Sequence, residues 1–139
     1  MKGVEIFFDS NIIVYFSTNT DKTKQRVAST LIDSAFERGH AGISAQVMQE
    51  CINVLGGKYK VPPAILDDYI SNVLRPLYRV DTTAELIDSA VDIKRQWKYS
   101  FYDSLIIAGA LACDAKTLYS EDLQHAQRID SLTIINPFI

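Results

Sequence analysis

The chain has 139 residues, of which 47% are hydrophobic and 22% charged, a composition typical of one soluble globular domain and unlike that of a disordered chain. Only a short apolar run precedes Asp9, and no stretch approaches the ~20 apolar residues of a membrane span. We therefore expect a single domain over residues 1–139, located in the cytoplasm. The formal net charge of −3 gives no basic excess of the kind that favours phosphate binding, although four acids held on a metal would leave the remainder near neutral. Cys51 and Cys113 stand apart without zinc-ligand spacing, which predicts core thiols.

Short apolar runs alternate with helical periodicity along the first part of the chain. Residues 4–8 form an apolar run typical of a buried strand, which stops at Asp9. Residues 22–38 carry apolar side chains at spacings of three and four, which predicts an amphipathic helix with Gly39 as its stop. Residues 41–44 are expected to form a second short strand.

The middle of the chain has clear helix boundary signals. Ser44 is placed to cap a helix that runs to the glycine pair at 56–57. Pro62 and Pro63 open the next helix, and we expect Pro76 to end it before a third strand at residues 77–80.

The last part of the chain repeats the alternation of helices and strands. One of residues 81–83 is expected to cap an amphipathic helix that reaches Trp97. A helix that begins near Tyr102 is apolar almost all round, so it should be central and buried. Two strands at residues 116–120 and 132–136 should flank a short polar helix at residues 123–129. Five strands alternating with helices predict an α/β three-layer sandwich around a mainly parallel sheet.

Four acids stand where an ordinary solvated helix face would not place them. Asp9 and Asp122 each follow a strand, at the edge where α/β sheets place ligands. Glu50 lies beside a buried apolar stripe, and Asp103 begins the apolar helix. Structural roles remain open for each of them: Asp9 and Asp103 could cap helices, Glu50 could reach solvent, and Glu121 competes with Asp122.

A shared metal site would explain the positions of all four acids. Clustered carboxylates repel one another and stay ionised together mainly when a divalent cation neutralises them, and Mg²⁺ and Mn²⁺ prefer oxygen ligands. Such a cation activates water and stabilises charge on a phosphodiester that is being hydrolysed. The pattern therefore favours a metal-dependent hydrolase of nucleic acid.

Five segments in the same order resemble the motifs of PIN domains, and among these the VapC toxins of toxin-antitoxin pairs. The resemblance covers essentially the whole chain, and its segments are residues 7–15, which contain the Asp-Ser-Asn sequence, 44–50, 102–108, 119–123 and 134–138.

The resemblance implies the PIN fold and an endoribonuclease toxin that uses Mg²⁺ or Mn²⁺, cleaves RNA, pairs with a VapB-like antitoxin and forms a homodimer. It implies that a tetrad of acids binds the metal and carries out catalysis. The family pattern selects Asp122 rather than Glu121 as the fourth acid, although Glu121 could contribute in its place or alongside it. It also implies polar support from three further residues. The tetrad is Asp9, Glu50, Asp103 and Asp122, and the supports are Ser10, Asn11 and Ser120.

Other assignments fit the sequence less well. A haloacid-dehalogenase-like phosphatase requires a second aspartate two residues after Asp9, where Asn11 stands. A response-regulator receiver requires an early adjacent acid pair, which Glu5 and Asp9 do not supply. A PIN-fold nuclease of RNA processing outside a toxin-antitoxin pair and a PIN fold that only binds protein remain alternatives.

Overall fold

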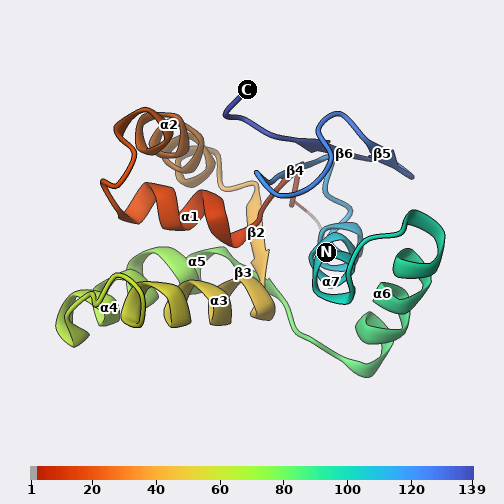
Figure 1. Cartoon of the computed structure of the whole chain (residues 1–139), viewed down its shortest axis with the longest axis horizontal. Coiled ribbons are helices and arrows are strands. Elements are labelled where there is room, and N and C mark those ends of the chain that lie inside the picture. The colour runs from red at the N-terminus through yellow and green to blue at the C-terminus, as the bar shows by residue number, and fades with distance from the viewer. Residues whose placement is uncertain (1–2) are drawn as a thin grey trace.

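The computed structural model, which describes residues 3–139, contains a mainly parallel sheet with helices on both sides (Figure 1). The strand order is β3-β2-β1-β4-β6-β5, and every neighbouring pair is parallel except β5 and β6. The α/β class and the mainly parallel sheet predicted from the sequence are therefore confirmed. The strands are β1 (Ile6–Phe8), β2 (Ala41–Ser44), β3 (Tyr78–Val80), β4 (Thr117–Tyr119), β5 (Arg128–Ile129) and β6 (Leu132–Ile135).

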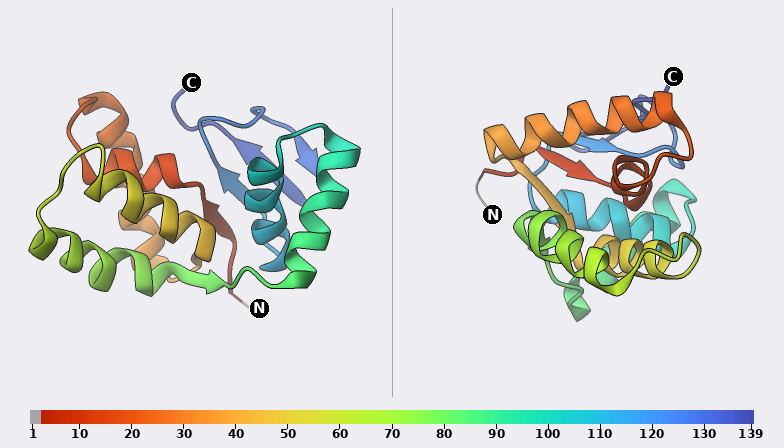
Figure 2. Two further views of the ribbon diagram at one scale, coloured as in Figure 1. Left: turned by 60° about the horizontal axis from the view of Figure 1, so that its bottom comes forward. Right: turned by 90° about the vertical axis from the view of Figure 1, so that its left-hand side faces the viewer.

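Helices connect the parallel strands and cover both faces of the sheet. The turned view at the right of Figure 2 places the long α2 on one side of the strands and α3 to α5 on the other. Within residues 3–139, none of the helices is long and apolar enough to cross a membrane. The helices are α1 (Ser10–Ser17), α2 (Lys22–Arg38), α3 (Ala45–Gly56), α4 (Pro63–Tyr69), the π-helical segment η1 (Ile70–Leu74), α5 (Arg75–Leu77), α6 (Ala84–Trp97) and α7 (Phe101–Ala112).

Several helix boundaries follow the predicted signals. Ser44 caps α3 by accepting a hydrogen bond from the Val47 backbone N–H, and Thr83 caps α6 in the same way through Leu86. Gly39 ends α2 in the left-handed conformation (φ 72°) that glycine adopts without strain.

Helix α7 is the central buried helix that its composition predicts, and it brings a candidate acid to the sheet edge. Residues 104–110 are all buried. Gly109 permits the close approach, because a Cβ at this position would lie 3.2 Å from Phe7 Cζ and 3.3 Å from Ser44 Cβ. The helix is capped by Ser100, which accepts from the backbone N–H of Asp103. Asp103 therefore lies in the first turn and is not the cap.

The predicted end of a helix at Pro76 is wrong by a small margin. The segment continues through η1 into α5, which ends at Leu77. In η1 the backbone N–H of Arg75 donates to the Ile70 carbonyl, five residues back. A wider turn of this kind lets the chain pass the proline, which has no N–H to contribute.

The predicted polar helix at residues 123–129 is not formed, and a sixth strand takes part of its place. Its backbone donors and acceptors pair with β6 instead: Ala126 N donates to Ile134 O at 2.7 Å, and Ile134 N donates to Gln127 O at 2.9 Å. Ala126 also has a positive φ of 68°, which no helix tolerates. Strand β5 then pairs antiparallel with β6, so the sheet has six strands rather than five.

Candidate metal centre

Asp9 lies at the carboxyl edge of the two central strands. Strands β1 and β4 are paired in parallel with Phe8 opposite Tyr119, and the Asp9 backbone N–H continues the pairing by donating to Tyr119 O at 3.0 Å. The register therefore places Asp9 beside Ser120. The Ser120 hydroxyl donates to Asp9 Oδ2 at 2.7 Å, and the Ser10 backbone N–H donates to Asp9 Oδ1 at 2.7 Å. These bonds fix a carboxylate that is only 5% exposed.

Asn11 links the helix after Asp9 to the loop that carries Asp122. Its amide nitrogen donates to Asp122 Oδ2 at 3.1 Å, and its carbonyl oxygen accepts from the Glu121 backbone N–H at 3.2 Å. The Asp122 backbone N–H donates to the Ser120 hydroxyl at 3.2 Å. All three residues suggested as polar supports, Ser10, Asn11 and Ser120, thus contact Asp9 or Asp122.

Glu50 and Asp103 are carried by helices α3 and α7. The amide of Gln46, one turn before Glu50 on α3, donates to the Tyr102 carbonyl at 3.0 Å. This bond ties α3 to the first turn of α7, next to Asp103. Glu50 Oε1 is buried and has no hydrogen-bond partner among the described residues. A buried carboxylate oxygen without a partner is unfavourable unless a ligand or proton satisfies it.

The charges of the four acids influence one another's titration. Burial raises the pKa of Asp9 from 3.8 to about 6, against the opposing hydrogen bonds of Ser120 and Ser10, and the charges of Glu50 and Asp122 raise it further. Burial also raises the pKa of Glu50, against the opposing effect of the polar side chains of Ser10 and Gln46, and the charges of Asp103 and Asp122 raise it further. Each of the four acids therefore acts on, or is acted on by, another member of the set.

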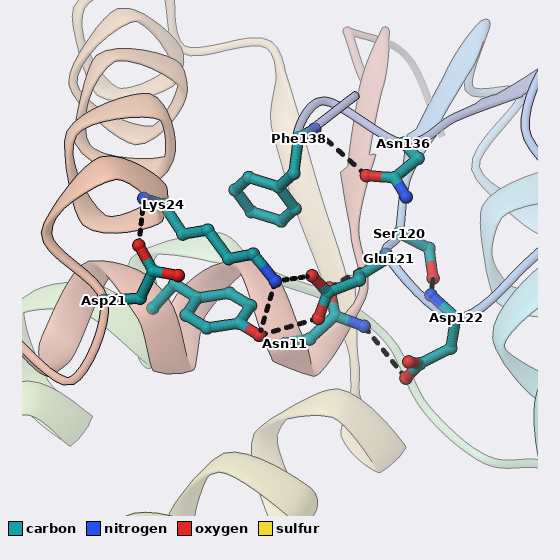
Figure 3. Close-up of polar contacts among 9 residues, drawn as sticks. Asn11, Asp21, Lys24, Ser120, Glu121, Asp122, Asn136 and Phe138 are labelled. Atoms are coloured by element: carbon teal, nitrogen blue, oxygen red, sulfur yellow. Dashed lines mark hydrogen bonds and ion pairs between the residues drawn. The ribbon is translucent and has the colours of Figure 1, made fainter.

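Glu121 is occupied by a separate set of contacts on the neighbouring helices. Figure 3 shows the Lys24 side chain, from the first turn of α2, extending to the Glu121 carboxylate, with which it forms an ion pair. The Tyr15 hydroxyl donates to Glu121 Oε1 at 2.7 Å. The Lys24 ammonium also lies 5.0 Å from the centre of the Tyr15 ring and 5.6 Å from that of Phe138, distances at which cations are attracted to aromatic rings. These contacts favour Asp122 over Glu121 as the acid that is free to bind a ligand.

The donor set fits a hard divalent cation. All four side chains offer carboxylate oxygens, and the partnerless Glu50 Oε1 is an acceptor that such an ion or its water would satisfy. Among residues 3–139, no three acids, histidines or cysteines lie close enough together to enclose one ion. Mg²⁺ is commonly held by one or two carboxylates and completes its shell with water and substrate oxygens, so an open arrangement of this kind is compatible with it.

Sequence reasoning missed the residues that hold this loop in place. Tyr15 lies four positions after Asn11, on the same face of α1, and this spacing is the only signal that could have found it. Lys24 resembles any surface lysine at the start of a helix, so no local pattern reveals its partner. Both cysteines are buried free thiols, as predicted.

A family model and several solved structures match this chain. The model described as the PIN domain matches residues 6–131. A chain of a toxin-antitoxin complex from Klebsiella pneumoniae has a TM-score of 0.68 at 17% identity and covers 96% of this chain and 98% of its own. The toxin VapC20 of Mycobacterium tuberculosis, described as cleaving the sarcin-ricin loop, has a TM-score of 0.62 at 18% identity. The match covers 82% of this chain and 87% of the VapC20 chain.

A third structure, VapBC2 from Rickettsia felis bound to a DNA fragment from its promoter, gives a TM-score of 0.60 at 19% identity, with 94% and 97% of the two chains covered. Comparison with curated protein sequences gives no match. At these identities the structural matches establish the fold, while the family model covers most of the chain. The chain therefore belongs to the PIN-domain family.

Proposed function

We propose that this protein is a divalent-metal-dependent endoribonuclease and the toxin of a VapBC-type toxin-antitoxin pair. The observation that carries the proposal is the buried carboxylate of Asp9 at the carboxyl edge of β1 and β4, which is connected through Ser120 to the loop of Asp122. The charges of Glu50 and Asp122 raise the pKa of Asp9, and the charge of Asp103 raises that of Glu50. Membership of the PIN-domain family and the toxin neighbours support the same reading.

In the proposed reaction Asp9, Asp103 and Asp122 would hold the cation, and Glu50 would orient the attacking water. A bound Mg²⁺ or Mn²⁺ supplies Lewis acidity to the phosphodiester and lowers the pKa of water. Ser120 and Asn11 keep the Asp9 and Asp122 carboxylates in place through the bonds at 2.7 and 3.1 Å. This division of roles requires neither a histidine nor a serine nucleophile.

The structural neighbours also support partner proposals. Two of them were solved as toxin-antitoxin assemblies, and we propose that a VapB-like antitoxin binds this chain. We further propose that the protein forms a homodimer through apolar side chains of α2 and α4, where Phe36 is 40% exposed and Ile65 is 50% exposed. Exposed apolar groups of this size are more stable when a second chain covers them.

The test compares RNA cleavage by the wild type and by Asp103→Asn, with Mn²⁺ and with EDTA. Asparagine keeps the size of the side chain and removes one charge, so the variant should fold, as checked by circular dichroism, and lose cleavage by orders of magnitude. Asp33→Asn, an exposed acid on α2, is the matched control and should cleave like the wild type. Expression of the wild type alone should stop cell growth, and expression of the variant should not.

Two results would contradict the proposal. Cleavage that persists in EDTA would exclude the metal-dependent mechanism. Equal cleavage by the wild type and Asp103→Asn would remove this acid from the site, whatever the fold.

A further inference from the structure

A pocket of about 290 Å³ is lined by Gln46 and Tyr102, whose hydrogen bond ties α3 to α7, and by none of the four acids. Helices α3, α6 and α7 and the turn before α6 form its walls, with Gln46, Gln49, Thr82, Ile87 and Tyr102 among the lining residues. None of the described residues that line it is charged. A phosphate or an acidic peptide would therefore find no counter-ion there, whereas a neutral planar group would be compatible with it.

Sequence spacing places the pocket next to the acidic site. Gln46 lies one helical turn before Glu50 on α3, so the two side chains are neighbours on one face at roughly 5–6 Å between their Cβ atoms. Gln49 and Tyr102 directly precede Glu50 and Asp103. A ligand in the pocket would thus lie next to whatever binds the four acids.

Tyr102 provides an open aromatic surface at the mouth of this pocket. Its side chain is 67% exposed, although it belongs to a helix whose next turns are fully buried. The Tyr102 and Phe101 rings form a T-shaped pair, with ring centres 5.3 Å apart and planes at 73°, which orients the Tyr102 ring while most of it stays exposed. Exposed aromatic rings next to a basic or catalytic groove are the surfaces on which unpaired bases stack.

Gln46 adds an unused hydrogen-bond acceptor to the wall. Its Nε2 must face the Tyr102 carbonyl, because a carbonyl oxygen accepts and never donates. The amide orientation is therefore fixed, and Oε1 is left buried without a partner among the described residues, in a side chain that is 5% exposed. A ligand that carries N–H groups on its edge, as nucleobases do, would satisfy this acceptor after a small side-chain adjustment.

We propose that this pocket binds an unpaired nucleobase of the RNA next to the phosphodiester at the acidic site, with Tyr102 as the stacking surface and Gln46 and Gln49 at the base edge. The inference rests on the proposed ribonuclease function and adds to it the residues that hold one base beside the bond to be cleaved. A base inside a duplex is stacked on both faces and could not enter.

The test measures RNA binding without relying on cleavage. All proteins carry Asp9→Asn to prevent turnover, and the probe is a set of short single-stranded RNAs with one 2-aminopurine at successive positions. Fluorescence quenching should occur at one position and should be lost with Tyr102→Ala, whose affinity should fall roughly 5- to 150-fold, the range for loss of one base-aromatic stack. Tyr102→Phe should keep both the quenching and the RNA affinity, because the aromatic ring is retained. Tyr59→Ala, at a partly exposed tyrosine in the turn after α3, is the control and should bind normally.

A second arm uses the wild-type acidic site and measures kcat/KM on the same RNAs. The same Tyr102→Ala substitution should lower kcat/KM for the intact RNA and leave it unchanged for an RNA with an abasic residue at the quenched position. Cleavage by the wild type with no effect of Tyr102→Ala in either arm would overturn the pocket and leave the proposed function intact. If quenching depends on Tyr102 but the wild-type protein never cleaves RNA, the pocket is supported and the proposed ribonuclease function is overturned. Loss of self-association in Tyr102→Ala, with RNA binding unchanged, would also overturn the inference and assign the surface to a second copy of the chain.

Discussion

Replacement of Asp9 by asparagine should stabilise the metal-free protein at neutral pH while abolishing its activity. The pKa of Asp9 is about 6 in the folded protein, against 3.8 for a solvated aspartate, and burial is the main cause. At about 1.4 kcal/mol per pH unit, ionising this side chain costs the folded state about 3 kcal/mol. Asparagine avoids this cost and keeps most of the geometry: its oxygen can accept from the Ser10 N–H, and its amide can donate to the Ser120 hydroxyl.

The raised pKa of Asp9 determines how the folding stability of the wild type changes with pH. Between about pH 4 and pH 6 the folded protein binds more protons than the unfolded chain, because the folded pKa of Asp9 is the higher one, so stability falls as pH rises through this window. The stability difference between Asp9→Asn and wild type should therefore be small at pH 4, grow up to pH 6 and remain constant above. The lost ionic hydrogen bond with Ser120 offsets part of the gain, so we expect about 1–3 kcal/mol at pH 7, or roughly 4–12 °C in Tm.

The assay is thermal unfolding of both proteins in EDTA across pH 4–8. Groups that titrate in the same way in both proteins contribute equally to their stability, so the difference in stability reports on Asp9. Asp33→Asn serves as the control and should follow the wild type at all pH values. Added Mn²⁺ should raise the Tm of the wild type more than that of the variant, since ligand binding stabilises the folded state in proportion to affinity. A difference that is independent of pH, or a variant less stable than the wild type at pH 7, would refute the assignment of a strained buried carboxylate.

Three further predictions concern the surroundings of the site. Lys24→Met should release the loop of the fourth acid and lower cleavage at limiting Mn²⁺ by about 10-fold or more, as changes to outer partners of metal ligands do; a Mn²⁺ titration measures it, with the exposed Lys22→Met as control, and equal curves would exclude this role. Ser120→Ala removes a hydrogen bond that lowers the pKa of Asp9, so the acid limb of the pH-rate profile should move to higher pH. An acid limb at the same pH as in the wild type would contradict this prediction. Ile65→Glu should convert the dimer into a monomer by light scattering, and a wild type that is monomeric at micromolar concentration would refute the dimer.

The elements that could be predicted are those whose signals are local. Gly39 as the stop of α2, Ser44 as the cap of α3 and the apolar character of α7 each depend on neighbours within one or two helical turns. The failure at residues 123–129 has the opposite cause. That segment has a helix-like polar composition, but its backbone is satisfied by β6, which comes later in the chain and leaves no mark on the local pattern.

The same distinction divides the candidate site. The acids that follow β1 and β4 were predictable because parallel strands end at one edge of a sheet, and the register of Phe8 with Tyr119 then places Asp9 beside Ser120. The family pattern favoured Asp122 over Glu121, but the sequence did not reveal what Glu121 contacts. The Glu121 carboxylate pairs with Lys24, which lies 97 residues away along the chain.

The pairing of Lys24 with Glu121 also explains how two adjacent acids take different roles. Next to Lys24 and the Tyr15 hydroxyl, Glu121 has a cation and a donor, so its charge is balanced within the protein. Asp122 accepts from the neutral amide of Asn11 and, among the described residues, pairs with no cationic side chain, and its charge raises the pKa values of Asp9 and Glu50. The charge that the fold leaves unbalanced is therefore concentrated on the acids of the candidate site. A divalent cation bound there would relieve this repulsion, so the proposed metal should stabilise the folded protein.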